Sequence, residues 1–326
     1  MSTVPDWREG RKMIRAGADA GSRTFKAAAA LRKHRWTYVL LIPVIAYFFV
    51  FHYMPLYGIQ LAFKDFMIRK GISGSPWVGL KHFEVLLNSP IFQRALVNTL
   101  LISCYKLLFA FPAGVLFALM LNDLNNGWFK SFSQTFSYLP HFLSWVILGG
   151  ILSQVLSLDG AINAIRAFLG MEKVFFLTEP GMFRGIVVAS DIWKEVGWNS
   201  IIYLAAISGI GPELYEAARV DGAKKLQQVL RITLPMILPV ISIQFILQLG
   251  NILNAGFDQI FNLYNPTVYS TGDIIDTYVY RIGLTDKLQY SLSTAVGLFK
   301  NVIGCSLVIL ANAAVRGIGG GENSIW

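Results

Sequence analysis

The chain has 326 residues and a net charge of +9; 54% of its residues are hydrophobic, only 14% are charged, and the mean hydropathy is +0.52. This composition lies well outside the average of soluble domains and excludes a water-soluble globular protein. A bilayer core about 30 Å thick needs about 20 apolar residues per helix, so long apolar runs in this chain predict membrane spans.

The chain begins with a basic segment, in which residues 1–36 carry nine Lys and Arg against three acids. The segment lacks an apolar core beside a small-residue cleavage site, so a cleaved signal peptide is not expected. Residues 23–36 predict either a basic helix on anionic lipid or a solvated tail that its charge retains inside the cell. We expect residues 1–36 to be a cytoplasmic tail and residues 37–326 to form the membrane domain.

Six apolar runs follow, and they predict an all-α, polytopic protein with six transmembrane helices. They cover residues 38–63, 99–121, 132–156, 183–207, 236–257 and 292–315. Cys104 and Cys305 lie inside predicted spans, where thiols are common packing groups and no disulfide is implied.

Basic residues indicate the orientation of these spans, since translocation disfavours Lys and Arg near span ends. With the N-terminus inside, fifteen Lys and Arg lie in inner segments and ten in outer ones. We therefore expect both termini in the cytoplasm. This orientation also places the polar loop between the fourth and fifth spans, residues 208–235, on the cytoplasmic side.

The loop over residues 208–235 has the features of a helical surface element. Residues 213–220 are helix formers with acids first and an arginine near the end, which suits the helix dipole. Gly222 permits a sharp bend, and residues 223–232 predict a second short helix. Pro235 and Pro239 are tolerated where the next span begins. We expect two short helices lying across the cytoplasmic face.

The first of these helices is expected to dock a partner protein. Ala217 and Ala218 are small, so a partner surface can approach the helix backbone closely. Glu216, Arg219 and Asp221 offer directed charge contacts.

The stretch EAARVDGAKKLQQVLRITLP in this loop resembles the signature loop of permease subunits of binding-protein-dependent ABC importers. The family pattern is Glu-Ala-Ala, three residues, Gly, nine residues and Ile-x-Leu-Pro, which the chain matches at Glu216, Ala217, Ala218, Gly222, Ile232, Leu234 and Pro235. The resemblance implies the type I ABC importer permease fold, with a coupling helix in this loop that sits in a cleft of an ATPase subunit. These residues, with Arg219 and Asp221, are the expected ATPase-coupling residues.

Three further stretches, MPLYGIQLAFKDF, GSPWVGLKHF and YLPHFLSW, resemble segments of carbohydrate permeases that handle oligo- or polysaccharides, those of bacterial alginate importers among them. The resemblance implies an importer of the bacterial inner membrane with a second, homologous permease, two ATPase subunits and an extracytoplasmic solute-binding protein, surrounded by lipid. This chain would form half of the pore for alginate or a related acidic saccharide; a permease for neutral oligosaccharides is the alternative. The resemblance implies no cofactor on this chain, ATP and Mg on the partner ATPases, and no nucleic acid.

Two polar stripes are candidates for a substrate pathway. In the fourth span one helix face carries Asp191, Lys194, Glu195, Trp198 and Asn199. In the fifth span the stripe has offsets of zero, four, seven and fourteen residues and consists of Gln244, Gln248, Asn251 and Asp258. Charges at membrane depth are costly unless paired or wetted, and amides can replace water around a sugar. One alternative is that Lys194 is neutralised by its acidic neighbours or by another helix and has a structural role. The other is that the amides join helices by hydrogen bonds.

Lys106 and Lys300 lie inside the second and sixth spans with no acid within four residues of either. Each must snorkel, find a partner elsewhere in the fold or face water. If both face the pore, together with Lys194 and with Arg184, which lies at the outer rim, these cations favour an anionic passenger.

Other function classes find less support in the sequence. A secondary, ion-coupled transporter is expected to show internal repeats or interrupted helices with ion-binding carboxylates, and no convincing repeat is present. No His-Glu-x-x-His or Gly-x-Ser-x-Gly motif marks an enzyme, and no Gly-x-x-x-x-Gly-Lys-Ser/Thr loop marks an ATPase. We therefore expect a transport subunit and not an enzyme. The long outer loops, residues 64–97 and 258–290, are expected to dock a binding protein or to cover the pore mouth.

Overall fold

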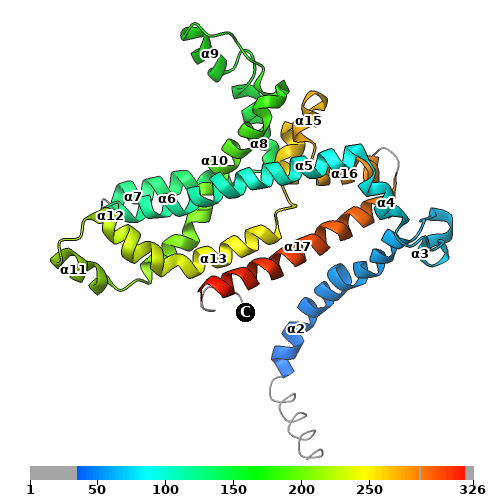
Figure 1. The fold of residues 1–326 in the computed structure, drawn as a ribbon, viewed down its shortest axis with the longest axis horizontal. Coiled ribbons are helices and arrows are strands. Elements are labelled where there is room, and N and C mark those ends of the chain that lie inside the picture. Colours follow the sequence, from blue (N-terminus) through cyan, green and yellow to red (C-terminus); the bar gives the residue numbers. More distant parts are fainter. Residues whose placement is uncertain (1–34, 126, 286–287, 320–326) are drawn as a thin grey trace, which may run out of the picture. The chain divides into compact units, whose positions relative to one another are not determined.

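Figure 1 shows the fold in a computed structural model, which describes residues 35–125, 127–285 and 288–319. Within these residues every regular element is a helix, apart from one isolated bridge of extended backbone between Lys64 and Trp77. The all-α prediction is confirmed for this part of the chain. The tail predicted over residues 1–36 lies outside the described residues except for Arg35 and Trp36.

The chain divides into two units, one ending at Gln60 and the other beginning at Leu61. The described part of the first unit consists of α2 (Arg35–Phe48), the π-helical η1 (Phe49–Tyr53) and most of the 3-10 helix η2 (Met54–Phe63). Together these elements form one helical run, Arg35–Phe63, which contains the first predicted span. The run is apolar on all sides, as expected for a helix that lipid surrounds.

The second unit contains the remaining long helices. They are α5 (Pro90–Tyr105), η4 (Lys106–Ala110) and α6 (Phe111–Asp123); α7 (Gly127–Tyr138), η5 (Leu139–Phe142) and α8 (Trp145–Val155); α10 (Pro180–Ser208); α12 (Lys225–Gln228), η7 (Val229–Thr233) and α13 (Leu234–Gly250); and α17 (Tyr290–Gly319). The connections hold η3 (Ile68–Lys70), α3 (Gly71–Gly74), α4 (Lys81–Leu87), α9 (Ala161–Phe168), η6 (Phe176–Thr178), α11 (Pro212–Val220), α14 (Phe257–Leu263), η8 (Pro266–Val268), α15 (Tyr269–Gly272), α16 (Ile275–Tyr280) and η9 (Arg281–Thr285).

Four helical runs in the described residues are long and apolar enough to cross a membrane, and a bent pair of helices makes a fifth if it counts as one span. The four are Arg35–Phe63, Pro90–Asp123, Lys225–Gly250 and Tyr290–Gly317. The helix α10 has 29 residues, which is enough to span, but it carries charges near its middle and is not among them. The sixth span therefore stays a prediction.

The third predicted span, residues 132–156, is wrong as a single straight helix. The chain bends by 103° between Gly127–Phe142 and Trp145–Val155. Pro140 lies just before the bend, Leu143 and Ser144 are extended, and the Ser144 hydroxyl accepts a hydrogen bond from the Ile147 N–H at 3.4 Å. A proline followed by an N-cap serine ends one helix and starts another, so α8 begins in a new direction.

Three of the helical rods contain a π-helical turn at the same place relative to a proline. The elements η1, η4 and η7 each end two residues before a proline, namely Pro55, Pro112 and Pro235. A proline has no N–H, so the carbonyl four residues earlier loses its α-helical partner. In all three rods that carbonyl lies inside the π turn, which widens the helix there and lets it continue.

Two predictions about the region after α11 are wrong. The second short helix expected over residues 223–232 is not separate, because α12, η7 and α13 form one continuous run, Lys225–Gly250. The fifth span was expected to reach residue 257, but the helix ends at Gly250. Asn251 caps it, and the chain then turns through Gly256, which has a left-handed φ of +98°.

The helix α10 lies at the centre of the second unit. It crosses the rod formed by α5, η4 and α6 and also packs on α7 and α13 (Figure 1). Phe183 near its start belongs to one apolar cluster with Ile260, and Tyr203 near its end belongs to another with Val115. At Gly197 a Cβ atom would come within 2.3 Å of the Ser137 carbonyl oxygen, so only glycine allows α7 and α10 to cross this closely.

Asp273, between α15 and α16, is fully buried at the centre of a polar network. Arg281 donates to both carboxylate oxygens, at 2.8 and 2.6 Å, and Thr277 donates at 2.8 Å. The hydrogen bonds to Asp273 raise the pKa of Arg281 above its usual value. Asn98 of α5 donates to the backbone carbonyl of Asp273 at 3.0 Å, so the network ties this connection to α5.

Replacing Asp273 by Ala is expected to lower the free energy of unfolding by about 3–5 kcal/mol, because the largely buried Arg281 loses its counter-charge. The midpoint of thermal unfolding of the purified protein measures this loss. Asp159→Ala is the control, since Asp159 pairs with Lys173 at 2.9 Å but its side chain is 93% exposed, and little change is expected. Equal shifts in the two variants would contradict the assigned role of Asp273.

Candidate functional site

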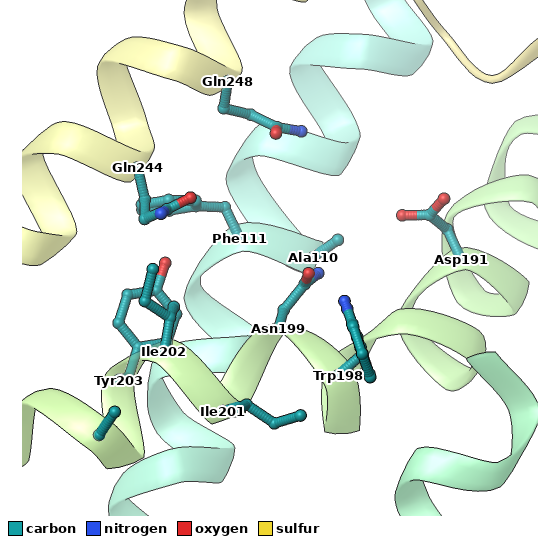
Figure 2. Close-up of a pocket in the computed structure, with 11 residues that line it drawn as sticks. Ala110, Phe111, Asp191, Trp198, Asn199, Ile201, Ile202, Tyr203, Gln244 and Gln248 are labelled. Carbon is teal, nitrogen blue, oxygen red and sulfur yellow. The ribbon is translucent and has the colours of Figure 1, made fainter. Parts of the chain in front are cut away.

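A cavity of about 490 Å³ lies between α10, α13 and the junction of η4 with α6 (Figure 2). Its polar wall comes from α10 and α13, and the remaining wall is aromatic or aliphatic. The lining residues are Ala110, Phe111, Asp191, Trp198, Asn199, Ile201, Ile202, Tyr203, Ala205, Gln244 and Gln248. The fold thus brings five predicted pathway residues, from two different spans, to one space.

The polar groups reach this cavity from opposite sides. Figure 2 shows Gln244 and Gln248, one turn apart on α13, facing Asp191, Trp198 and Asn199 on α10. The three α10 residues share a face because they are seven and eight residues apart. Carboxamides supply both donors and acceptors, and an indole supplies a flat apolar surface, so the wall suits a ligand rich in hydroxyl groups.

Lys106 is buried beside this cavity at the start of η4. Its ammonium nitrogen lies 2.7 Å from Asp191 Oδ1, 2.7 Å from Gln259 Oε1 and 3.0 Å from the Ala255 carbonyl oxygen. Gln259 in turn donates to α10, at 2.7 Å to the Val187 carbonyl. Of the three possibilities that the sequence left open, Lys106 therefore has a partner elsewhere in the fold.

Lys300 of α17 is also paired. Its ammonium donates to the carboxylate of Asp276 on α16, and its side chain is 12% exposed. Arg184 donates to Asn98 at 2.8 Å and to the Thr271 carbonyl at 3.2 Å. In the described part of the chain, none of these cations lines the cavity of Figure 2.

Lys194 and Glu195 form a cluster with the bend of the third span. Lys194 donates to the His141 carbonyl at 2.6 Å and lies 3.2 Å from Glu195, whose other oxygen is 2.7 Å from His141 Nδ1. The His141 ring stacks on Trp198 with centroids 4.2 Å apart. These contacts hold η5 against α10 and favour the alternative in which Lys194 has a structural role.

The second stripe does not extend along one helix as its spacing predicts. Asn251 caps α13, and its amide donates to the Leu247 carbonyl at 3.2 Å. Asp258 is exposed on α14, beyond the turn at Gly256, so it does not continue the helical register of Gln244 and Gln248. Asn251 lines a separate, smaller cleft together with Lys300.

The predicted coupling loop presents its polar residues on the surface. The helix α11 has no buried residue, and the exposed positions include Glu216, Ala217, Arg219 and Asp221, whereas Ala218 is half-buried. Gly222 follows with a left-handed φ of +76°, as the predicted bend requires.

The other half of the loop attaches it to the helices. Ile232 and Leu234 pack against the apolar cluster that contains Tyr203, while Pro235 is exposed. The Tyr215 hydroxyl lies 2.9 Å from Thr233 Oγ1, which joins α11 to the start of α13. Lys225 pairs with Asp123 at the end of α6, a contact that the sequence does not signal.

Several residues of the site have no local signal in the sequence. Gln259 is separated from Lys106 by 153 positions, and Asp276 from Lys300 by 24. Phe111 and Tyr203 of the cavity wall are indistinguishable in the sequence from other aromatic residues in apolar runs. The sequence shows that a buried charge needs a partner, but not which one.

The family described as "Binding-protein-dependent transport system inner membrane component" matches residues 110–318. A polygalacturonan/rhamnogalacturonan transport system permease protein of Bacillus subtilis is 44% identical over 290 residues, 89% of this chain and 90% of the relative. Protein LplB of Bacillus subtilis is 42% identical over 313 residues, 96% of each chain.

Two solved structures are similar over most of the chain. One is a crystal structure of a bacterial ABC transporter involved in the import of the acidic polysaccharide alginate, with a TM-score of 0.84 and 43% identity over 91% of this chain and 99% of that one. The other is the bacterial alginate ABC transporter in complex with an alginate pentasaccharide-bound periplasmic protein, with a TM-score of 0.82 and 42% identity over 88% and 96%.

Cysteine labelling tests whether the cavity of Figure 2 holds water. In a chain with Cys104 and Cys305 replaced by Ser, Gln248→Cys is expected to react with a water-soluble maleimide, because Gln248 lines the cavity and is exposed. Ile246→Cys on the same helix is the control, and it should react much more slowly since Ile246 is fully buried. Similar labelling rates at the two positions would contradict a water-filled cavity.

Proposed function

Since this chain belongs to the family of binding-protein-dependent transport system inner membrane components, we propose that it forms half of a pore for an acidic saccharide. It is a permease subunit of an ABC importer of oligo- or polysaccharides and resides in the inner membrane. The subunit is not an enzyme, and ATP hydrolysis takes place on partner subunits. A solute-binding protein is among its partners.

We choose an acidic substrate because the chain is similar to two importers of acidic polymers. The solved structures belong to a transporter of alginate, which is an acidic polysaccharide, and the relative at 44% identity is named for polygalacturonan, a polymer of galacturonate. Alginate or another oligouronate is therefore the passenger that we propose. Neutral oligosaccharides are the second candidate, because amides and aromatic residues line the cavity and no Lys or Arg among the described residues does so.

The cavity of Figure 2 is the proposed contribution of this chain to the pathway. Gln244, Gln248 and Asn199 can exchange hydrogen bonds with sugar hydroxyls as water would, and Trp198 can pack against a sugar ring. A second, homologous permease would supply the facing wall. In this assignment both termini and α11 lie in the cytoplasm, while the connections 64–97 and 258–290 face the binding protein.

The loop around α11 is the proposed coupling element to two ATPase subunits, which would hold ATP and Mg. Three observations support this proposal. The helix α11 has no buried residue, the signature residues match the family pattern, and the chain bends at Gly222. From Lys225 the chain continues without a break through α13 to Gln244 and Gln248. At 1.5 Å per residue this rod carries motion over about 35 Å, from the ATPase contact to the pathway.

The proposed cycle is alternating access driven by the ATPases. Closure of the two ATPases on ATP and docking of the loaded binding protein would both favour the outward-open state. By linkage, docking should then raise ATPase activity, because both partners stabilise one conformation.

Variants of the coupling loop test this transmission in the reconstituted importer. Glu216→Lys reverses an exposed charge of α11, and Gly222→Pro forbids the positive φ, so both are expected to abolish binding-protein-stimulated ATPase activity or to release the ATPases. Glu172→Lys, which reverses another exposed acid in a different connection, is the control and should leave stimulation unchanged. If the two loop variants assemble and respond like the native chain, the loop is not the coupling element.

The same assay tests the substrate. Tetragalacturonate or an alginate tetrasaccharide, delivered with the binding protein, is expected to stimulate ATPase activity and uptake, whereas neutral oligosaccharides of equal length are not. Stimulation by neutral sugars alone would leave the permease assignment in place and remove the acidic one.

A further inference from the structure

Asp191 is the one charged residue in the cavity wall within the described residues. Its side chain is 19% exposed, and Figure 2 shows it directed toward the cavity. An uncompensated carboxylate at this place would repel a chain of uronates, because like charges at close quarters cost several kcal/mol. The proposed function therefore raises the question of how a polyanion passes Asp191.

Lys106 supplies the compensation from outside the cavity. An ammonium group has three N–H donors, and this one has three acceptors at 2.7, 2.7 and 3.0 Å, from Asp191, Gln259 and Ala255. The side chain is 10% exposed, so the ammonium is held between η4, α10 and the turn before α14. Its charge faces Asp191, and Lys106 is not among the residues that line the cavity of Figure 2.

The turn that presents the Ala255 carbonyl is shaped around this ammonium. Gly256 has a φ of +98°, and a Cβ atom there would lie 3.0 Å from the Lys106 nitrogen. Gln259 is oriented by its own hydrogen bonds to Val187 and to Ser190 Oγ, at 2.7 and 2.9 Å. The position of the Lys106 charge is therefore fixed by several elements.

No other described cation is placed to balance Asp191. Lys194, one turn further along α10, points to His141 and Glu195, and Arg184 points to Asn98 and Thr271. Among the described residues, Asp191 Oδ2 accepts no hydrogen bond, whereas Oδ1 accepts from Lys106. Oδ2 is thus available to a ligand hydroxyl.

We propose that Lys106 determines the charge selectivity of this half of the pathway by neutralising Asp191 from behind the cavity wall. The neutralised carboxylate then accepts a hydrogen bond from a saccharide hydroxyl through Oδ2 without repelling the carboxylates of the passenger. Lys106 is a positioning residue, since it acts through Asp191 and does not touch the substrate. The inference rests on the proposed function.

Two single variants break the same ion pair but leave opposite charges behind. Lys106→Gln leaves the Asp191 carboxylate, and Asp191→Asn leaves the Lys106 ammonium. A purely structural pair predicts similar losses in both variants, whereas charge selectivity predicts an asymmetry. Uptake is measured in proteoliposomes with the complete importer and its binding protein, using tetragalacturonate or an alginate tetrasaccharide, whichever the native complex imports.

Lys106→Gln is expected to lower uptake of the oligouronate by about tenfold or more. Asp191→Asn is expected to lower it by a clearly smaller factor, because the Asn carboxamide oxygen still accepts a hydrogen bond and carries no negative charge. The double variant Lys106→Gln/Asp191→Asn should recover to the uptake of Asp191→Asn, because it too leaves no carboxylate in the cavity wall. The thermal unfolding midpoint of each complex is recorded alongside. The pair Lys300→Gln and Asp276→Asn is the matched control, since it breaks a second largely buried ion pair away from this cavity and should give two effects of equal size.

Equal losses in Lys106→Gln and Asp191→Asn, a larger loss in Asp191→Asn, or no recovery in the double variant would each overturn the inference. If Lys106→Gln does not assemble, Asp191→Asn alone decides, and a loss of uptake beyond about tenfold overturns the inference. Failure of the proposed function looks different, because the native complex itself would then import no oligouronate.

Discussion

The charges of α10 must all be satisfied inside a protein that lipid surrounds, and the packing of the second unit depends on that constraint. Arg184 bonds to α5, Asp191 to the lysine of η4, and Lys194 and Glu195 to the bend at His141. A charge left unpaired at membrane depth is costly, so each contact fixes a neighbouring element at one height along α10. Packing of apolar helix faces alone could not fix these heights, because such faces slide past one another at little cost in lipid.

The prolines act on the same framework by controlling where helices stay straight and where they turn. Pro55, Pro112 and Pro235 are absorbed by π turns, so their rods continue, whereas Pro140 precedes a true break. The break follows at Leu143 and Ser144, where Ser144 supplies an N-cap for a new helix. The unbroken run Lys225–Gly250 therefore joins the loop around α11 to the polar wall of the cavity.

The lining of the cavity reconciles two observations that otherwise conflict. Two of the similar transporters are named for acidic polymers, alginate and polygalacturonan, yet the cations inside the predicted spans do not line this cavity. A wall of amides, an indole and a neutralised carboxylate can hold sugar hydroxyls without repelling an anionic passenger. Recognition of the carboxylates would then fall to other parts of the importer, such as the binding protein.

The sequence by itself determined the class of protein, most of the helical runs, the exposed loop around α11 with its bend at Gly222, and the polar faces that carry Asp191, Asn199, Gln244 and Gln248. These features depend on composition, on helical period and on a fixed local motif, all of which act over a few turns of chain. The tertiary structure alone decided that Lys106 pairs with Asp191 and Lys300 with Asp276, and that Lys194 donates a hydrogen bond to His141 at the bend. It also decided that Asp258 is not part of the stripe, because the helix ends at Gly250 and the chain turns at Gly256 before α14 begins. Partners that lie far apart in sequence meet only when the helices pack, and one pairing joins positions 85 residues apart.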